Sequence, residues 1–139
     1  MDTTFKDSWK NLVKPHVGTQ AEQIELLKNH ENERFLFSWN ELVIGVLSIN
    51  AGKWVFEYSE EYRNRDDLRP VANFVDKNKI YISDTLWPFF FNRIPTPNQP
   101  IVQRHFERTG EVFNTADQVE MLRRFGIRTI DNPFVLEAA

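Results

Sequence analysis

The residues that could carry out acid–base or metal chemistry are few and scattered along the chain. The three histidines, His16, His30 and His105, stand too far apart for a local metal-binding motif. The acidic pairs Glu60-Glu61 and Asp66-Asp67 lie in a strongly charged stretch, where solvation accounts for them without any catalytic role. We therefore expect no catalytic residues, no metal site and no cofactor.

The sequence also lacks the motifs of a serine nucleophile and of a phosphate-binding loop. None of the serines has the flanking residues of a nucleophile elbow, and the five glycines stand singly rather than in a phosphate-binding loop. The chain has no cysteine, which excludes disulfides, thiolate metal sites and a cysteine nucleophile. These absences argue against an enzyme.

One segment favours binding instead of catalysis. Residues 84–100 contain four aromatic rings and four prolines. Because proline fixes φ and lacks a backbone donor, the segment cannot form a regular strand and holds its large apolar rings on a stiff backbone. Such a segment either fills a core or anchors a partner protein. Trp87 is the leading candidate anchor, and the expected partner-binding residues are Trp87, Phe89, Phe90 and Arg93.

Length and composition predict one soluble domain that binds proteins. The 139 residues suit a single domain, and 41% hydrophobic with 27% charged residues is typical of a globular chain. A formal net charge of -3 gives no general attraction to nucleic acid. The N-terminus lacks the pattern of a signal peptide, and no apolar stretch is long enough to span a membrane. We expect a cytoplasmic protein with no membrane contact and no direct nucleic-acid contact.

Two helical patterns open the chain. Apolar residues recur at helical spacing from Phe5 to Val13, and this helix is expected to end near Lys14, before a proline. A capping-box pattern at Thr19 then predicts a second helix that runs to about Asn29. We therefore predict an N-terminal helical extension over residues 1–33, followed by the main domain over residues 34–139.

The middle of the chain predicts strands. Residues 35–37 and 42–49 are expected to form a hairpin, with a third strand at 53–58 after a turn that contains Gly52. A charged, solvated loop with at most a short helical turn follows over residues 59–69. A further hairpin, with strands at 71–75 and 80–82, would complete a small antiparallel sheet of about five strands.

Two helices follow the aromatic segment. The first is expected to start at Pro100 and end near Gly110. The second is expected to start from a capping box at Thr115 and to end at Gly126 in the left-handed region. With helices covering the sheet, the fold class is α+β.

A nucleic-acid-binding domain is the alternative that the residues themselves raise. Aromatic residues alternate along strand 53–58, as in sheets that stack RNA bases, but such residues more often face the core of their own domain. Five arginines near the C-terminus could touch phosphates, although acidic residues intersperse them and favour a mixed solvated face. These arginines are Arg104, Arg108, Arg123, Arg124 and Arg128.

Four segments of the chain occur in the order found in a known family. They are Leu42–Ser48, Trp54–Tyr58, Leu86–Pro95 and Asp117–Gly126. In this order they resemble the N-terminal subdomain of HipA-type serine/threonine kinase toxins, and the likeness spans about residues 35–126. The resemblance implies a small α+β subdomain of a kinase toxin.

Three departures from the family pattern refine this expectation. Thr96-Pro97 replace the usual Glu-Gly pair, residues 1–33 have no counterpart, and the sequence stops at Ala139, where a HipA-like protein would continue into its kinase core. The resemblance then implies a HipS-type antitoxin of a split system, with a HipT-like kinase as its partner and a HipB-like helix-turn-helix DNA-binding protein as a possible second one. A non-inhibitory module that joins kinase and DNA-binding protein stays open, as does a small nucleic-acid-binding domain.

Overall fold

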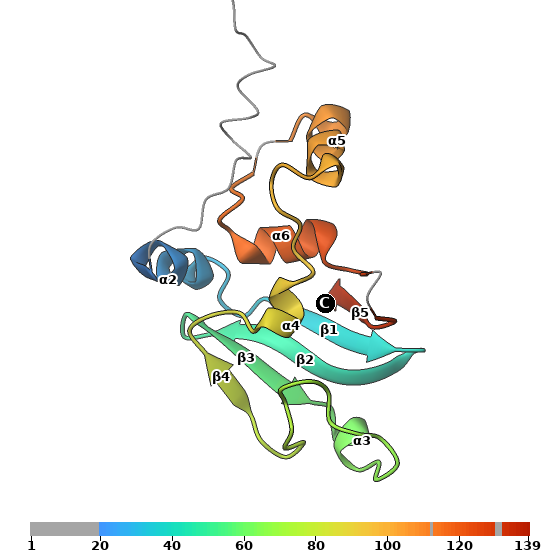
Figure 1. Cartoon of the computed structure of the whole chain (residues 1–139). Helices are drawn as coiled ribbons and strands as arrows, with labels where there is room; N and C mark the ends of the chain where they lie inside the picture. The colour runs from blue at the N-terminus through green and yellow to red at the C-terminus, as the bar shows by residue number, and fades with distance from the viewer. Residues whose placement is uncertain (1–19, 112, 130–131) are drawn as a thin grey trace, which may run out of the picture.

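A computed structural model describes residues 20–111, 113–129 and 132–139 (Figure 1). Strands and helices alternate irregularly along the chain, which fits the expected α+β class. The strands are β1 (Arg34–Trp39), β2 (Leu42–Asn50), β3 (Lys53–Tyr58), β4 (Tyr81–Ser83) and β5 (Val135–Ala138). The helices are α2 (Gln20–Lys28), α3 (Glu60–Arg63), α4 (Pro88–Phe91), α5 (Pro100–Thr109) and α6 (Gln118–Phe125).

The strands form one antiparallel sheet in the order β4-β3-β2-β1-β5. Tight turns join β1 to β2 and β2 to β3, and both central residues of each turn have positive φ. Such turns match the right-handed twist of the strands they connect. The turn residues are Asn40, Glu41, Ala51 and Gly52. The predicted hairpin and third strand are thus confirmed.

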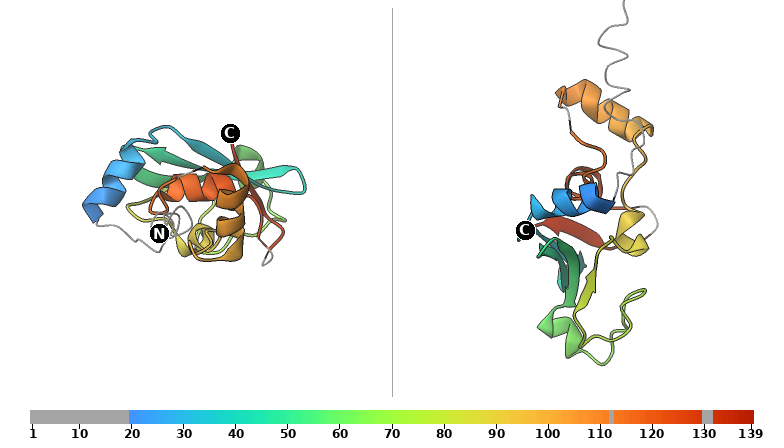
Figure 2. Two further views of the ribbon diagram at one scale, coloured as in Figure 1. Left: turned by 90° about the horizontal axis from the view of Figure 1, so that it is seen from above. Right: turned by 90° about the vertical axis from the view of Figure 1, so that its left-hand side faces the viewer.

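The core lies between one face of the sheet and the helices α2, α4 and α6 (Figure 1). Trp54, Phe56 and Tyr58 alternate along β3 and are buried, as the sequence predicts. Burial of large apolar side chains is the main favourable term in folding. Helix α5 lies beyond α6, on the side away from the sheet (Figure 2), and packs there through a second, smaller apolar cluster.

The predicted strand over residues 71–75 is wrong. Only an isolated bridge joins Val71 to Phe74, and the fifth strand is β5, which pairs with β1. The reason lies in Tyr58, whose hydroxyl accepts a hydrogen bond from the Val71 amide (2.8 Å) and donates one to the Phe74 carbonyl (2.5 Å). A side chain therefore satisfies backbone groups that a sheet ladder would otherwise have to satisfy.

The sequence predicts the positions of α5 and α6 correctly, but it does not predict both ends of α6. Helix α5 ends at Gly110, which has φ +67, and α6 lies where the sequence places it. The N-cap of α6 is Asp117, which accepts a hydrogen bond from the Glu120 amide, so the expected cap at Thr115 is wrong. Gly126 has φ -93 instead of a left-handed conformation. A Cβ there would lie 2.8 Å from a Leu122 oxygen, so close packing requires this glycine.

The N-terminal region is only partly described. Helix α2 confirms the second predicted helix, whereas the helix predicted between Phe5 and Lys14 lies outside the described residues. Helix α3 is the short helical turn allowed for in the charged loop. The division into residues 1–33 and 34–139 stays a prediction. No helix in the described part of the chain is long and apolar enough to cross a lipid bilayer.

Candidate partner-binding groove

An apolar groove of about 400 Å³ opens at the end of the sheet where β1 turns into β2. Ile44 of β2, Tyr62 of α3 and the loop after α3 line its interior, and three further aromatic side chains line it from separate segments. These three are Trp39 at the end of β1, Phe89 in α4 and Phe134 before β5. The groove therefore exists only when the sheet, α4 and the C-terminal strand are assembled.

Phe37 holds two of these rings in place from below. It is fully buried, and its ring lies edge-on to Phe89 at 5.6 Å and tilted against Phe134 at 5.0 Å. Aromatic pairs at these centroid distances contribute roughly 0.5–1.5 kcal/mol beyond their burial. The aromatic side of the groove is consequently part of the core and is preorganised for contact.

The loop between α3 and β4 forms the opposite side of the groove, and Lys77 fixes it. The Lys77 ammonium donates to the carbonyls of Tyr62 (3.3 Å), Arg65 (2.7 Å) and Leu68 (2.9 Å). The Tyr62 hydroxyl donates to the Arg69 carbonyl at 2.5 Å. Residues 64–69, which were expected to be part of a solvated loop, therefore have fixed backbone geometry where they line the groove.

The predicted partner-binding residues are separated by the fold. Phe89 lines the groove, while Trp87 is half-buried and packs edge-on against Phe74 at 5.1 Å, outside the groove. Phe90 is fully buried among the rings of Phe37 and Phe56. Phe90 has no surface to offer a partner in this structure, because the helical turn of α4 points it at the sheet. A contact role for Trp87 stays a prediction.

Arg93 is likewise buried, with 5% of its surface exposed, and serves the fold. Its guanidinium donates to the carbonyls of Gly126 (3.0 Å), Ile127 (3.2 Å) and Phe134 (3.0 Å), and to the Asn132 side chain (3.1 Å). Burial lowers the pKa of Arg93 from its usual value. Arg93 thus joins the end of α6 to the segment before β5 and positions Phe134, and direct partner contact by Arg93 does not fit this burial.

The chemistry of the groove is that of an apolar receptor with one cation. Among its lining residues Arg69 alone is charged, and no ion pair of Arg69 occurs within the described residues. Trp39, which lines the same groove, exposes 38% of its surface. Tryptophan and arginine are both enriched among the residues that dominate protein–protein binding energy. The groove is therefore suited to an apolar side chain of another protein.

Three of the four rings that line the groove, Trp39, Tyr62 and Phe134, were not predicted from the sequence. Pro133-Phe134 repeats the Pro-Phe pairing of Pro88-Phe89, a signal that could have pointed to Phe134. Trp39 directly precedes the Asn-Glu turn, and a large ring at a hairpin end is a second available signal. Neither signal says that the two residues meet, because their proximity depends on the pairing of β5 with β1.

The aromatic residues of β3 cannot stack on nucleic-acid bases in this structure, because Trp54, Phe56 and Tyr58 are buried. Two of the five arginines lie on a mixed face of the kind that the sequence predicts: Arg123 pairs with Glu33 at 2.6 Å and Arg124 with Glu111 at 2.5 Å. Within the three described ranges, no group of three or more histidine or acidic residues could hold a metal ion.

The fold and the groove define a small α+β domain with a preorganised apolar groove at one end of its sheet. Residues 36–130 match the HipA N-terminal domain family, which is more than half of the chain. The chain belongs to this family, in agreement with the resemblance drawn from its motifs, and membership indicates a context related to toxin–antitoxin systems. The search of curated proteins found no match.

Proposed function

We propose that this chain is a HipS-type antitoxin that binds a HipT-like serine/threonine kinase toxin and neutralises it by protein contact, with no catalysis of its own. Family membership supports the toxin–antitoxin setting, and the groove lined by Trp39, Phe89 and Phe134 is the observation that carries the binding role. Such an antitoxin would act in the cytoplasm, beside the kinase.

The physical basis of the proposed binding is the burial of preorganised rings. Phe89 and Phe134 rest on Phe37, so a partner orders few side chains when it docks. Trp39 is the most exposed ring of the groove, and truncating an anchor of this type typically costs about 2 kcal/mol of binding energy. The Arg69 guanidinium would pair with an acidic group at the edge of the contact.

The test is reconstitution with a kinase. The chain is co-expressed with a HipT-like kinase, the complex is purified, and kinase phosphorylation is measured with and without the chain. We expect a stable complex and inhibited phosphorylation. Trp39→Ala should weaken both, whereas the matched control Ile82→Ala should change neither, because Ile82 is exposed but lies outside the groove.

The other outcomes separate the alternatives. A complex in which phosphorylation continues unchanged would identify a non-inhibitory module that links the kinase to a helix-turn-helix DNA-binding partner. The absence of any complex with a HipT-like kinase would contradict the proposal.

A further inference from the structure

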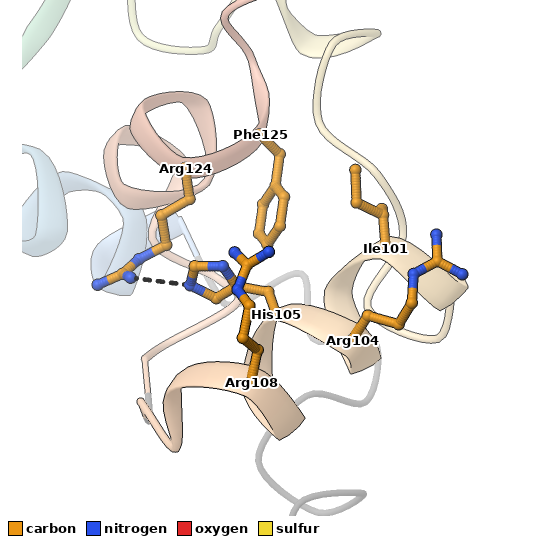
Figure 3. Close-up of a pocket in the computed structure, with 6 residues that line it drawn as sticks. All are labelled: Ile101, Arg104, His105, Arg108, Arg124 and Phe125. Carbon is orange, nitrogen blue, oxygen red and sulfur yellow. Dashed lines mark hydrogen bonds between the residues drawn. The ribbon is translucent and has the colours of Figure 1, made fainter.

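A second hollow, of about 200 Å³, lies between α5 and α6 and shares no lining residue with the groove. Four of its residues come from α5 at positions 101, 104, 105 and 108, a spacing that places them on one helix face. Figure 3 shows all six side chains that line it: Ile101, Arg104, His105, Arg108, Arg124 and Phe125. Three of the six are arginines, so the hollow is predominantly cationic.

Arg124 is fixed by its neighbours. Its guanidinium pairs with Glu111 at 2.5 Å and with Glu120 at 3.8 Å, and it lies over the Phe113 ring at 4.6 Å. Its Nε atom is buried and has no hydrogen-bond partner in the structure. Arg124 therefore has a set orientation on one side of the hollow and keeps one unsatisfied donor.

Arg104 and Arg108 differ from Arg124 because neither forms an ion pair within the described residues. Both are exposed and project from successive turns of α5 (Figure 3). Two uncompensated guanidinium groups on one helix face repel each other weakly and attract an anion that can bridge them. This pair supplies the net positive charge of the hollow.

The surrounding packing keeps the hollow in shape. Val102, Phe113 and Met121 form the buried cluster that joins α5 to the chain near α6. The His105 ring lies edge-on to Phe113 at 5.8 Å and to Phe125 at 5.4 Å. The hollow therefore has a rigid base, and its two unpaired arginines stand at the solvent side.

We propose that this hollow binds a phosphate-type dianion carried on a phosphorylated side chain of a partner protein. A guanidinium presents a planar fork of donors that matches phosphate oxygens in pairs, and the Arg104–Arg108 pair offers two such forks. The volume accommodates one tetrahedral oxyanion and the side chain that carries it, since a water molecule occupies about 30 Å³.

A phosphoprotein fits the hollow better than a nucleic acid does. Nucleic-acid binding neutralises several phosphates along a basic stripe, whereas Glu111 and Glu120 beside Arg124 interrupt any such stripe here. The net charge of -3 also gives no general attraction to nucleic acid. This inference does not depend on the proposed antitoxin role, because it rests on a different surface.

The test is an NMR titration of the full chain with inorganic phosphate at constant ionic strength. We expect saturable amide shifts in α5 and α6, and about tenfold weaker binding in the double variant Arg104→Gln/Arg108→Gln. Arg34→Gln is the matched control, because Arg34 is also exposed and forms no ion pair within the described residues but lines neither surface, so the phosphate affinity of this variant should equal that of the wild type. Circular dichroism checks that each variant is folded.

The carrier is tested with a phosphoserine peptide, its unphosphorylated twin and a short DNA duplex. We expect the phosphoserine peptide to bind at least tenfold more tightly than its twin, and the duplex to bind no better than the twin. The site would be overturned by phosphate-induced shifts that do not saturate, or by a loss of phosphate affinity in Arg34→Gln as large as that in the double variant. A duplex that binds more tightly than the phosphopeptide, or two peptides of equal affinity, would overturn the proposed ligand.

Discussion

The groove and the hollow are two concave surfaces of one small domain, built by different means. The groove is lined by Trp39, Phe89 and Phe134 and carries one cation, whereas the hollow carries three arginines around two apolar side chains. Burial of apolar area is nearly insensitive to salt, while exposed charges are screened beyond about 8 Å at physiological ionic strength. Salt dependence therefore distinguishes a ligand of the groove from a ligand of the hollow.

The two surfaces also rest on different supports. The groove is part of the main core, which includes the sheet and Phe37, while the hollow rests on the smaller cluster of Val102, Phe113 and Met121. A small cluster buries less area and opens at lower free energy than a main core does. We therefore expect local opening to need more free energy at the groove than at the hollow.

Removing the support of the groove should have the largest effect. Phe37→Ala deletes a fully buried ring beneath Phe89 and Phe134, and we expect a loss of about 3–5 kcal/mol in the free energy of unfolding. Urea denaturation measures it, with Ile82→Ala as the exposed control. A loss below about 1 kcal/mol would mean that the groove does not share the main core.

The second-largest loss of stability is expected when the buried hydrogen bonds of Arg93 are removed. Arg93 joins the end of α6 to the segment that carries Phe134, and Arg93→Met would leave several carbonyls without their donor. We expect a loss of roughly 2–3 kcal/mol, because buried unsatisfied groups keep their desolvation penalty. Arg93→Lys should recover only part of it, since lysine lacks the planar fork. Equal stability of the arginine and lysine forms would contradict this role.

The anchor of the groove is tested by comparing two tryptophans. Trp39→Ala should weaken kinase binding by about thirtyfold with little change in stability, and the affinity of the wild type should vary little with salt. Trp87→Ala should lower the unfolding free energy, because its ring packs on Phe74. The two variants are compared under conditions in which both are folded. If Trp87→Ala then weakens kinase binding more than Trp39→Ala does, the anchor is Trp87, as the sequence predicted, and not a residue of the groove.

The smallest expected effect is a pH dependence of stability at His30, in the turn after α2. Nε2 of His30 lies 2.8 Å from Asp117, and Nδ1 lies 3.2 Å from Glu33, which also binds Arg123. Burial opposes the charged imidazolium, but the hydrogen bonds and charges of Asp117 and Glu33 outweigh it and raise the pKa of His30 above 6.5. The group is partly solvated, so we expect a contribution of at most about 1 kcal/mol.

The sign of this effect follows from linkage. Because the folded pKa of His30 exceeds its ordinary value of 6.5, the contact stabilises fully below that pH and is lost as the pH rises through the folded pKa. Urea denaturation between pH 5.5 and pH 8 should show this fall in the wild type and a smaller fall in His30→Gln, a variant that keeps a polar group and loses the charge. Identical pH profiles would contradict it.

Local elements were largely predictable from the sequence. The alternation of apolar residues in 53–58, the turns before Leu42 and Lys53 and the helical periods of α5 and α6 are all found in the structure. The strand predicted at 71–75 does not form, because the Tyr58 hydroxyl of β3 hydrogen-bonds to the Val71 amide and to the Phe74 carbonyl. Strand β5 was missed because its short sequence acquires strand geometry only by pairing with β1.

The sequence by itself therefore determined the fold class and the family, because periodicity, turn residues and motif order depend on neighbours along the chain. The tertiary structure decided which rings form the surface. Within the aromatic segment, Phe90 is buried in the core, whereas Phe89 lines the groove. Trp39 and Phe134, which are distant in the sequence, line the groove together with Phe89. Their meeting depends on strand order and long-range pairing, which local sequence does not encode.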